Sequence, residues 1–166
     1  MNLSTLRSDL LAQLPPSARR RELLELLQAW LRSHLKEWNS DTRSALGLDD
    51  LVSMDLSRLP IDESALEPDE EIRQLRNVPP SSKDTFGMFL RDILWNGITV
   101  ETPIRCPNCE GPTLEVLVDV ERDEIVLACD QCGYAQTPSG VPWHFQGHWL
   151  QPASAARIQQ YRDSGH

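Results

Sequence analysis

The chain has 166 residues, of which 40% are hydrophobic, and its 25 acidic residues outnumber its 16 lysines and arginines, giving a net charge of −9. This length and composition predict one or two compact domains and exclude collagen-like and disordered proteins. No stretch approaches the roughly 18 apolar residues of a membrane span, and Arg7 and Asp9 interrupt the first apolar stretch, where a signal peptide needs an uncharged core. We therefore expect a cytoplasmic protein without a membrane partner. Its negative field disfavours nucleic acid and favours a protein partner, most readily a basic one.

Helical patterns dominate the first 97 residues. Ser17 is a candidate N-cap, and Gly97 and the proline pairs at 15–16 and 79–80 mark helix ends. Packing of the apolar stripes predicts a helical domain over residues 1–97. The predicted helices cover residues 4–14, 19–38, a short turn at 45–47, 67–76 and 82–97.

After Gly97 the apolar period changes from helical to two-fold. The fold class is therefore α+β, with the helical domain packed on a small C-terminal β-hairpin domain at 98–152, followed by a tail at 153–166 with helical potential. The alternation predicts a short strand at residues 98–102, a strand with one buried face at 113–120, a turn at 121–124 and a return strand at 125–128.

All four cysteines lie close together in the sequence. Cys106 and Cys109 form one C-x2-C pair, Cys129 and Cys132 form a second, and 19 residues separate the pairs. Each pair can wrap a tight knuckle, and the hairpin between them brings four thiolates around one cation. The spacing predicts a single zinc ion, with iron as the lesser alternative. Redox-active dithiols and buried free cysteines are the interpretations without a metal.

The knuckles Cys106-Pro107-Asn108-Cys109 and Cys129-Asp130-Gln131-Cys132-Gly133 resemble the zinc-ribbon family, over about residues 98–134. Because sulfur fills all four positions, no site remains for water or substrate, and the zinc is expected to be structural. Zinc ribbons often contact nucleic acid or belong to transcription and translation machinery. The resemblance therefore implies such a role as one alternative.

Charge around the cysteines argues against that alternative. Residues 103–150 hold seven acidic residues and two arginines, whereas phosphate binding needs lysine and arginine on the contact face. A second acidic run at residues 49–71 is either a solvated segment or a surface that imitates phosphate and docks onto a basic protein. Its candidate partner-binding residues are Asp49, Asp50, Asp55, Asp62, Glu63, Asp69, Glu70 and Glu71.

Aromatic residues gather after the second knuckle. As a strand, residues 141–149 would place Trp143 and Trp149 on one face, which either packs against the helices or anchors a partner. His144 and His148 lie on the opposite face but lack the glutamate of a zinc hydrolase motif.

No catalytic motif accompanies these features. The sequence has no nucleophile elbow, Walker loop or dinucleotide fingerprint, and no cysteine beyond the four candidate ligands. We therefore expect a non-enzymatic zinc-binding protein that acts through protein–protein interaction, as an acidic immunity or antitoxin-like inhibitor of a basic, nuclease-type toxin. A nucleic-acid-associated or transcription-related ribbon protein is the alternative, and a redox protein using its C-x2-C pairs is a third.

Overall fold

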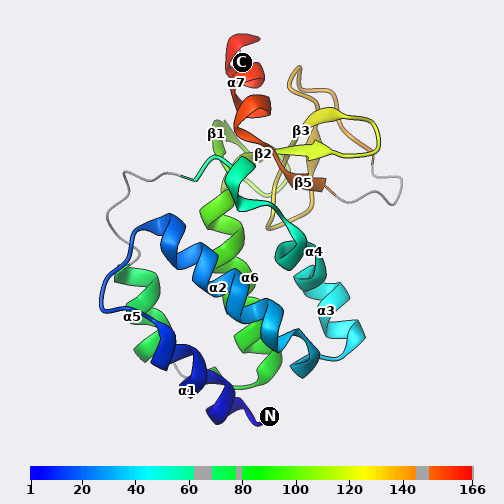
Figure 1. The fold of residues 1–166 in the computed structure, drawn as a ribbon. Coiled ribbons are helices and arrows are strands. Elements are labelled where there is room, and N and C mark those ends of the chain that lie inside the picture. The colour runs from blue at the N-terminus through cyan, green and yellow to red at the C-terminus, as the bar shows by residue number, and fades with distance from the viewer. Residues whose placement is uncertain (62–68, 78–79, 145–149, 166) are drawn as a thin grey trace. The chain divides into compact units, whose positions relative to one another are not determined.

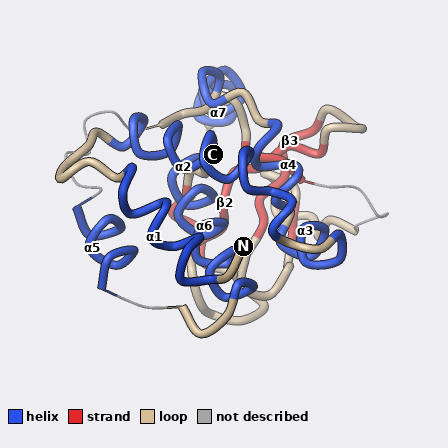
Figure 2. The backbone as a smooth tube through the Cα atoms, turned by 60° about the horizontal axis from the view of Figure 1, so that its bottom comes forward, coloured by secondary structure: helices blue, strands red, loops and turns tan. Residues whose placement is uncertain are grey.

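The computed structural model describes residues 1–61, 69–77, 80–144 and 150–165. The fold is α+β, as the sequence predicts, with most helices in the N-terminal part and an antiparallel sheet in the C-terminal part (Figures 1 and 2). The chain divides into two compact units. The helical unit comprises Met1–Leu56 and Ile61–Gly97, and the sheet unit comprises Ser57–Pro60 and Ile98–His166.

Amphipathic helices bury leucines and aromatic rings in the helical unit. Leu10, Leu27, Trp30 and Phe86 are almost fully buried, and the ring of Trp30 meets that of Phe86 edge-on at a centroid distance of 5.9 Å. The helices up to residue 98 are α1 (Leu3–Gln13), α2 (Arg20–His34), α3 (Ser40–Leu46), α4 (Leu48–Ser53), α5 (Asp69–Asn77) and α6 (Lys83–Ile98), with short 3-10 helices η1 (Leu35–Glu37) and η2 (Leu56–Arg58) (Figure 1).

Helix ends follow local chemistry, with one correction to the sequence prediction. Leu14 is extended, as expected for the residue before a proline, and ends α1. The predicted cap Ser17 is wrong because α2 begins later, at Arg20, where the backbone N–H of Arg19 donates to Glu22 Oε2 at 3.1 Å. This carboxylate also offsets the positive charge that Arg19, Arg20 and Arg21 place at the helix N-terminus.

Gly97 does not end α6, contrary to the prediction. The helix continues to Ile98, so the strand predicted at residues 98–102 begins too early. A Cβ atom at position 97 would lie 2.6 Å from Cδ2 of Leu24, which is itself buried. Gly97 therefore allows α6 to approach α2 closely.

The predicted turn at residues 45–47 is the end of one short helix and the start of another. Gly47 has φ of 62°, which only glycine adopts without strain, and it terminates α3 immediately before α4. The sequence pattern does not predict α4. Three of its six residues, Leu48, Leu51 and Val52, are buried, so packing stabilises a helix that is too short to form alone.

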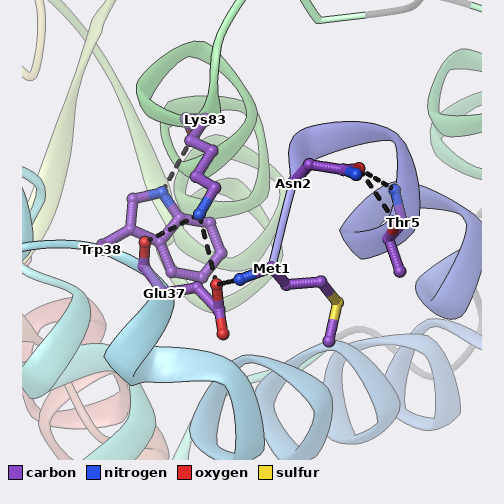
Figure 3. Close-up of polar contacts among 6 residues, drawn as sticks. All are labelled: Met1, Asn2, Thr5, Glu37, Trp38 and Lys83. Carbon is purple, nitrogen blue, oxygen red and sulfur yellow. Dashed lines mark hydrogen bonds and ion pairs between the residues drawn. The ribbon is translucent and has the colours of Figure 1, made fainter.

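A polar cluster joins η1 to the start of α6 (Figure 3). Lys83 Nζ lies 3.2 Å from Glu37 Oε2, and Trp38 Nε1 donates to the carbonyl oxygen of Lys83 at 2.9 Å. The Met1 amine also donates to Glu37, and the Asn2 side chain caps α1 by accepting from Thr5 N. These contacts hold segments distant in sequence at one end of α6.

The sheet unit contains more strands than the three that the sequence predicts. Strands β1 to β4 pair antiparallel in chain order. Strand β5 pairs with β2 along the same edge as β1, beyond the end of β1. The β2–β3 pairing runs from Glu115 opposite Ala128 to Asp119 opposite Glu124. The strands are β1 (Glu101–Arg105), β2 (Thr113–Asp119), β3 (Glu124–Ala128), β4 (Ala135–Gln136) and β5 (Leu150–Pro152).

The prediction of one buried face on β2 is wrong. Leu114 and Val116 are buried on one face, but Glu115, Leu117 and Asp119 are buried on the other. The strand is central, with β3 on one edge and β1 and β5 on the other. Its buried carboxylates are hydrogen-bonded: Glu115 Oε1 accepts from Thr99 Oγ1, and Asp119 Oδ1 accepts from two backbone amides of the following turn.

Helix α7 (Ala155–Asp163) completes the core of the sheet unit. These residues fall in the tail for which the sequence indicates helical potential, and they do form a helix, whose Ile158 and Tyr161 pack with the strands. Ser154 caps the helix by accepting from Arg157 N. The core residues are Cys106, Leu114, Val116, Leu127, Cys129, Ala153, Ile158 and Tyr161, so two of the cysteines belong to it.

Candidate metal centre

The two C-x2-C segments fold into knuckles of the same shape. In each, the residue four positions after the first cysteine donates its N–H to that cysteine's carbonyl: Glu110 to Cys106 at 3.1 Å and Gly133 to Cys129 at 3.0 Å. Both donors are left-handed, with φ of 52° for Glu110 and 70° for Gly133. The turn thereby aims the two sulfurs of each knuckle to the same side.

The four sulfurs converge on one point. All four Sγ atoms lie within 4.8 Å of one another, and two short contacts cross between the knuckles. Cys106 Sγ is 3.5 Å from Cys132 Sγ, and Cys109 Sγ is 3.8 Å from Cys129 Sγ. The chain thus holds four cysteines in position to bind one metal ion.

These distances fit a tetrahedral thiolate shell and do not fit disulfides. Metal–sulfur bonds of about 2.3 Å in a tetrahedron place the sulfurs about 3.8 Å apart. An S–S bond would need about 2.05 Å. The cysteines are accordingly free thiols.

The centre has a buried side and a solvent side. Cys106 and Cys129 are buried in the core of the sheet unit, whereas Cys109 and Cys132 are exposed. An ion bound here would be anchored to the core by one sulfur of each knuckle and covered toward solvent by the other.

Three neighbours of the sulfurs were not predicted from the sequence. The Asn108 side chain lies close enough to the sulfur of Cys132, in the opposite knuckle, to favour its thiolate form. Gln131 Oε1 lies 3.8 Å from Cys109 Sγ, and a Cβ at Gly111 would come within 2.5 Å of that oxygen. The sequence does show a polar residue between the two cysteines of each knuckle, Asn108 and Gln131. That these residues approach the sulfur of the opposite knuckle follows only from the fold.

The surroundings shift the thiol pKa values in opposite directions. The Asn108 side chain, aided by the Tyr134 amide, lowers the pKa of Cys132 to about 6. Burial raises the pKa of Cys129 to about 12. At Cys109 the Gly111 amide favours the thiolate, but desolvation and the sulfurs of Cys106 and Cys132 outweigh it, so its pKa is raised. A metal cation would favour the thiolate form at every position.

The predicted acidic surface is only partly described, and Asp49 and Glu71 are among its residues that have partners within the chain. Asp49 lies 3.6 Å from Arg43 and Glu71 lies 3.1 Å from Arg20. Asp50 is half-buried and Asp55 is exposed. Asp62 and Glu63 lie outside the described residues, and Asp69 and Glu70 belong to α5, whose first two side chains are not described.

Of the two predicted tryptophan anchors, the structure describes Trp143. It is half-buried, with the Arg122 guanidinium 4.8 Å above its ring. Trp149 and His148 lie outside the described residues, and His144 is exposed.

No protein-family model matches the chain, and neither a curated protein nor a solved structure matches it. The likeness to zinc ribbons therefore rests on the cysteine spacing and on the knuckle geometry. Within the described ranges, no helix is both long and apolar enough to cross a lipid bilayer.

Proposed function

We propose that the chain binds one zinc ion, which keeps the sheet unit folded and takes no part in a reaction. The single observation that carries this proposal is the convergence of four cysteine sulfurs within 4.8 Å of one another. Zinc suits an all-thiolate tetrahedral shell, and four protein ligands leave no open position for water or substrate. Four free thiols also fit the reducing cytoplasm.

Elemental analysis of the freshly purified chain tests the metal, with an expected content of one zinc per chain. In Cys106→Ser and Cys129→Ser, zinc should be lost and residues 98–163 should become sensitive to protease, while the helical unit remains protected. Ser139→Ala, an exposed change on the same unit, is the control and should leave both unchanged. A chain without zinc, or unchanged proteolysis in both cysteine variants, contradicts the proposal.

We further propose that the protein acts by binding a basic protein, as an immunity or antitoxin-like inhibitor of a nuclease-type toxin. The net charge of −9 supports this, because complementary fields speed association with a basic partner. No catalysis is assigned to the zinc, since sulfur fills its shell.

Affinity purification from the native cells, followed by an activity assay, tests this role. The expected result is co-elution of a basic nuclease whose activity falls when the purified chain is added, with slower association at higher ionic strength. Co-elution of polymerase or ribosome components, together with tight and salt-sensitive binding to DNA or RNA, would instead establish the nucleic-acid-associated alternative.

A further inference from the structure

The four sulfurs of the metal centre differ in their access to solvent. Cys109 and Cys132 are exposed, whereas Cys106 and Cys129 are only 1% and 2% exposed and belong to the core of the sheet unit. A small oxidant in solution therefore reaches one sulfur of each knuckle, while the other sulfur is shielded. Oxidation of cysteine follows this access, so it should begin at the two exposed sulfurs.

Each exposed sulfur lies beside a buried sulfur of the opposite knuckle. Cys132 Sγ is 3.5 Å from Cys106 Sγ, and Cys109 Sγ is 3.8 Å from Cys129 Sγ. An S–S bond of about 2.05 Å then requires the sulfurs to approach by less than about 2 Å, which rotation of the exposed side chain can supply. An exposed cysteine poised beside a second, resolving cysteine is the arrangement of thiol redox sensors.

We propose that the metal centre is also an oxidant-sensitive switch: hydrogen peroxide converts its four thiolates into two cross-knuckle disulfides, Cys106–Cys132 and Cys109–Cys129, and the zinc is released. This inference rests on the proposed zinc binding and adds the regulation of that site. Bound zinc keeps the sulfurs in the thiolate form, and the thiolate is the form that attacks peroxide. Once both disulfides have formed, no thiolate remains to hold the ion.

The chemistry balances for each pair of sulfurs. The exposed thiolate, at Cys132 or Cys109, attacks one oxygen of hydrogen peroxide, breaks the O–O bond and becomes a sulfenic acid as hydroxide leaves. The buried thiolate of its partner, Cys106 or Cys129, then attacks that sulfur and expels a second hydroxide, which leaves the disulfide. Two electrons pass from the two sulfurs to one peroxide molecule. Two peroxide molecules therefore oxidise all four thiolates, and zinc leaves with its charge unchanged.

Cross-knuckle disulfides would hold the two knuckles together in place of the metal. Their partners lie 26 and 20 positions apart in the sequence, so each bond closes a loop that contains the hairpin of β2 and β3. Such a loop restricts the unfolded chain. A disulfide within one knuckle would instead leave the knuckles separate. The oxidised chain should therefore stay folded without zinc, and a dithiol together with zinc should restore the metal-bound form.

Peptide mapping tests the pairing of the sulfurs. The zinc-loaded full chain is treated with hydrogen peroxide, then unfolded, alkylated to block free thiols and digested with trypsin without reduction. Cleavage at arginine places the first knuckle in the peptide 106–122 and the second knuckle in the peptide 123–157. We expect the two peptides to be joined, and tandem mass spectrometry of the joined product should assign the two proposed pairs.

A chromogenic zinc indicator follows the metal in parallel. Peroxide should release one zinc per chain as all four thiols are lost, and dithiothreitol with added zinc should reverse both changes. At limiting peroxide, dimedone, which traps sulfenic acids, should label Cys109 and Cys132 only. Met88→Leu removes an oxidisable side chain of the helical unit that is 48% exposed, and it should leave the rate of zinc release unchanged.

A protease assay compares two zinc-free forms of the chain. The oxidised form should keep residues 98–163 protected, whereas the reduced form prepared with a chelator should lose this protection. Protease sensitivity of both forms would overturn the replacement of the metal by disulfides.

The remaining outcomes separate the switch from the proposed function. A freshly purified chain without zinc would overturn both. Zinc that stays bound in peroxide, with four thiols intact, would overturn the switch and leave the structural zinc site standing. Separate tryptic peptides that each carry an internal disulfide, or thiols converted to sulfinic acids, would overturn the cross-knuckle chemistry.

Discussion

Gly133 shows how one backbone angle shapes the metal centre. Its φ of 70° closes the second knuckle, and a Cβ at this position would meet nothing within 4 Å. Any cost of substitution therefore comes from the backbone angle. Gly133→Ala should lower the free energy of unfolding of the zinc-loaded sheet unit by about 1 kcal/mol, the usual cost of a left-handed residue.

The matched variant for this position is Gly133→Asn, because asparagine tolerates left-handed angles better than alanine. It should lose less stability than Gly133→Ala in a urea titration that follows the sheet unit. Equal losses in the two variants would show that the angle is not the cause.

At Gly97 the requirement for glycine is steric. Its backbone φ is one that any residue can adopt, but there is no room for a Cβ atom. Alanine is favoured in a helix interior by about 1 kcal/mol, but overpacking a core costs about 1–3 kcal/mol. Because Leu24 is buried and its Cδ2 is 2.6 Å from the added Cβ, overpacking should prevail. We expect Gly97→Ala to destabilise the helical unit by about 1 kcal/mol, measured by urea unfolding.

A double-mutant cycle with Leu24→Ala separates the two terms. If steric overlap is the cause, Gly97→Ala should become neutral or stabilising once the leucine is shortened. Strictly additive effects would point to another origin.

Glu37 gives the helical unit a pH dependence of predictable sign. The hydrogen bonds from the Met1 amine and then from Lys83 hold the pKa of the Glu37 carboxyl below its usual range. A carboxyl with a lowered native pKa stabilises the fold above the unfolded value of about 4.3, and this contribution is lost as the pH falls through the native pKa.

Glu37→Gln should therefore destabilise the helical unit at pH 6 and have a smaller effect at pH 3. Urea midpoints from far-UV circular dichroism at the two pH values provide the measurement. Glu25→Gln, at an exposed glutamate of α2, controls for the loss of a charge. If the difference in urea midpoint between wild type and Glu37→Gln is the same at both pH values, the Glu37 carboxylate is not the source of the pH dependence.

At the scale of elements, the start of α6 depends on a single hydroxyl. Ser82 Oγ accepts from the backbone N–H of Thr85 at 3.0 Å, whereas Ser81 Oγ contacts only the Thr85 hydroxyl among the described contacts. Ser82→Ala should cost about 1 kcal/mol, the usual value of an N-cap. Ser81→Ala is the matched control and should cost much less in the same thermal unfolding experiment.

The elements that the sequence predicts are those with their own periodic signal. The apolar stripe of α2 and the four cysteines are local patterns, and both are found in the structure. By contrast, β4 and β5 have two and three residues, and α4 has six. Such short segments form because a neighbouring element supplies hydrogen bonds or an apolar surface. The periodicity of a single sequence does not reveal which element that is.

The same distinction holds for β2 and for the metal centre. Alternation in β2 predicts one buried face, but pairing on both edges and packing on both faces bury Glu115 and Asp119 as well. The spacing of the cysteines predicts the ligands, whereas the cross-knuckle contacts of Asn108 and Gln131 follow from how the knuckles meet.

At the scale of the whole molecule, the division into two units predicts an unequal response to metal removal. The four sulfurs belong to the sheet unit, and Cys106 and Cys129 are part of its core. After treatment with a zinc chelator, the amides of β2 and β3 should lose protection in hydrogen exchange, while those of α2 and α6 keep it.

Cys129→Ser provides the internal control for that experiment, since the chelator should cause no further change once a ligand is missing. Uniform loss of protection along the chain would show that the metal stabilises both units. Retention of protection throughout β2 would show that the sheet unit folds without it.

Strands β1 and β5 pair with the same edge of β2, although they lie on opposite sides of it in the sequence. Val116 donates its N–H to Val100 and accepts from the N–H of Ala153, so its two backbone groups are satisfied by segments on opposite sides of it in the sequence. As the ribosome releases the chain, both knuckles emerge and can take up metal while the carbonyl of Val116 still faces water. The core of the sheet unit is complete only when Ala153, Ile158 and Tyr161 follow, so all four proposed metal ligands are available before that core can close.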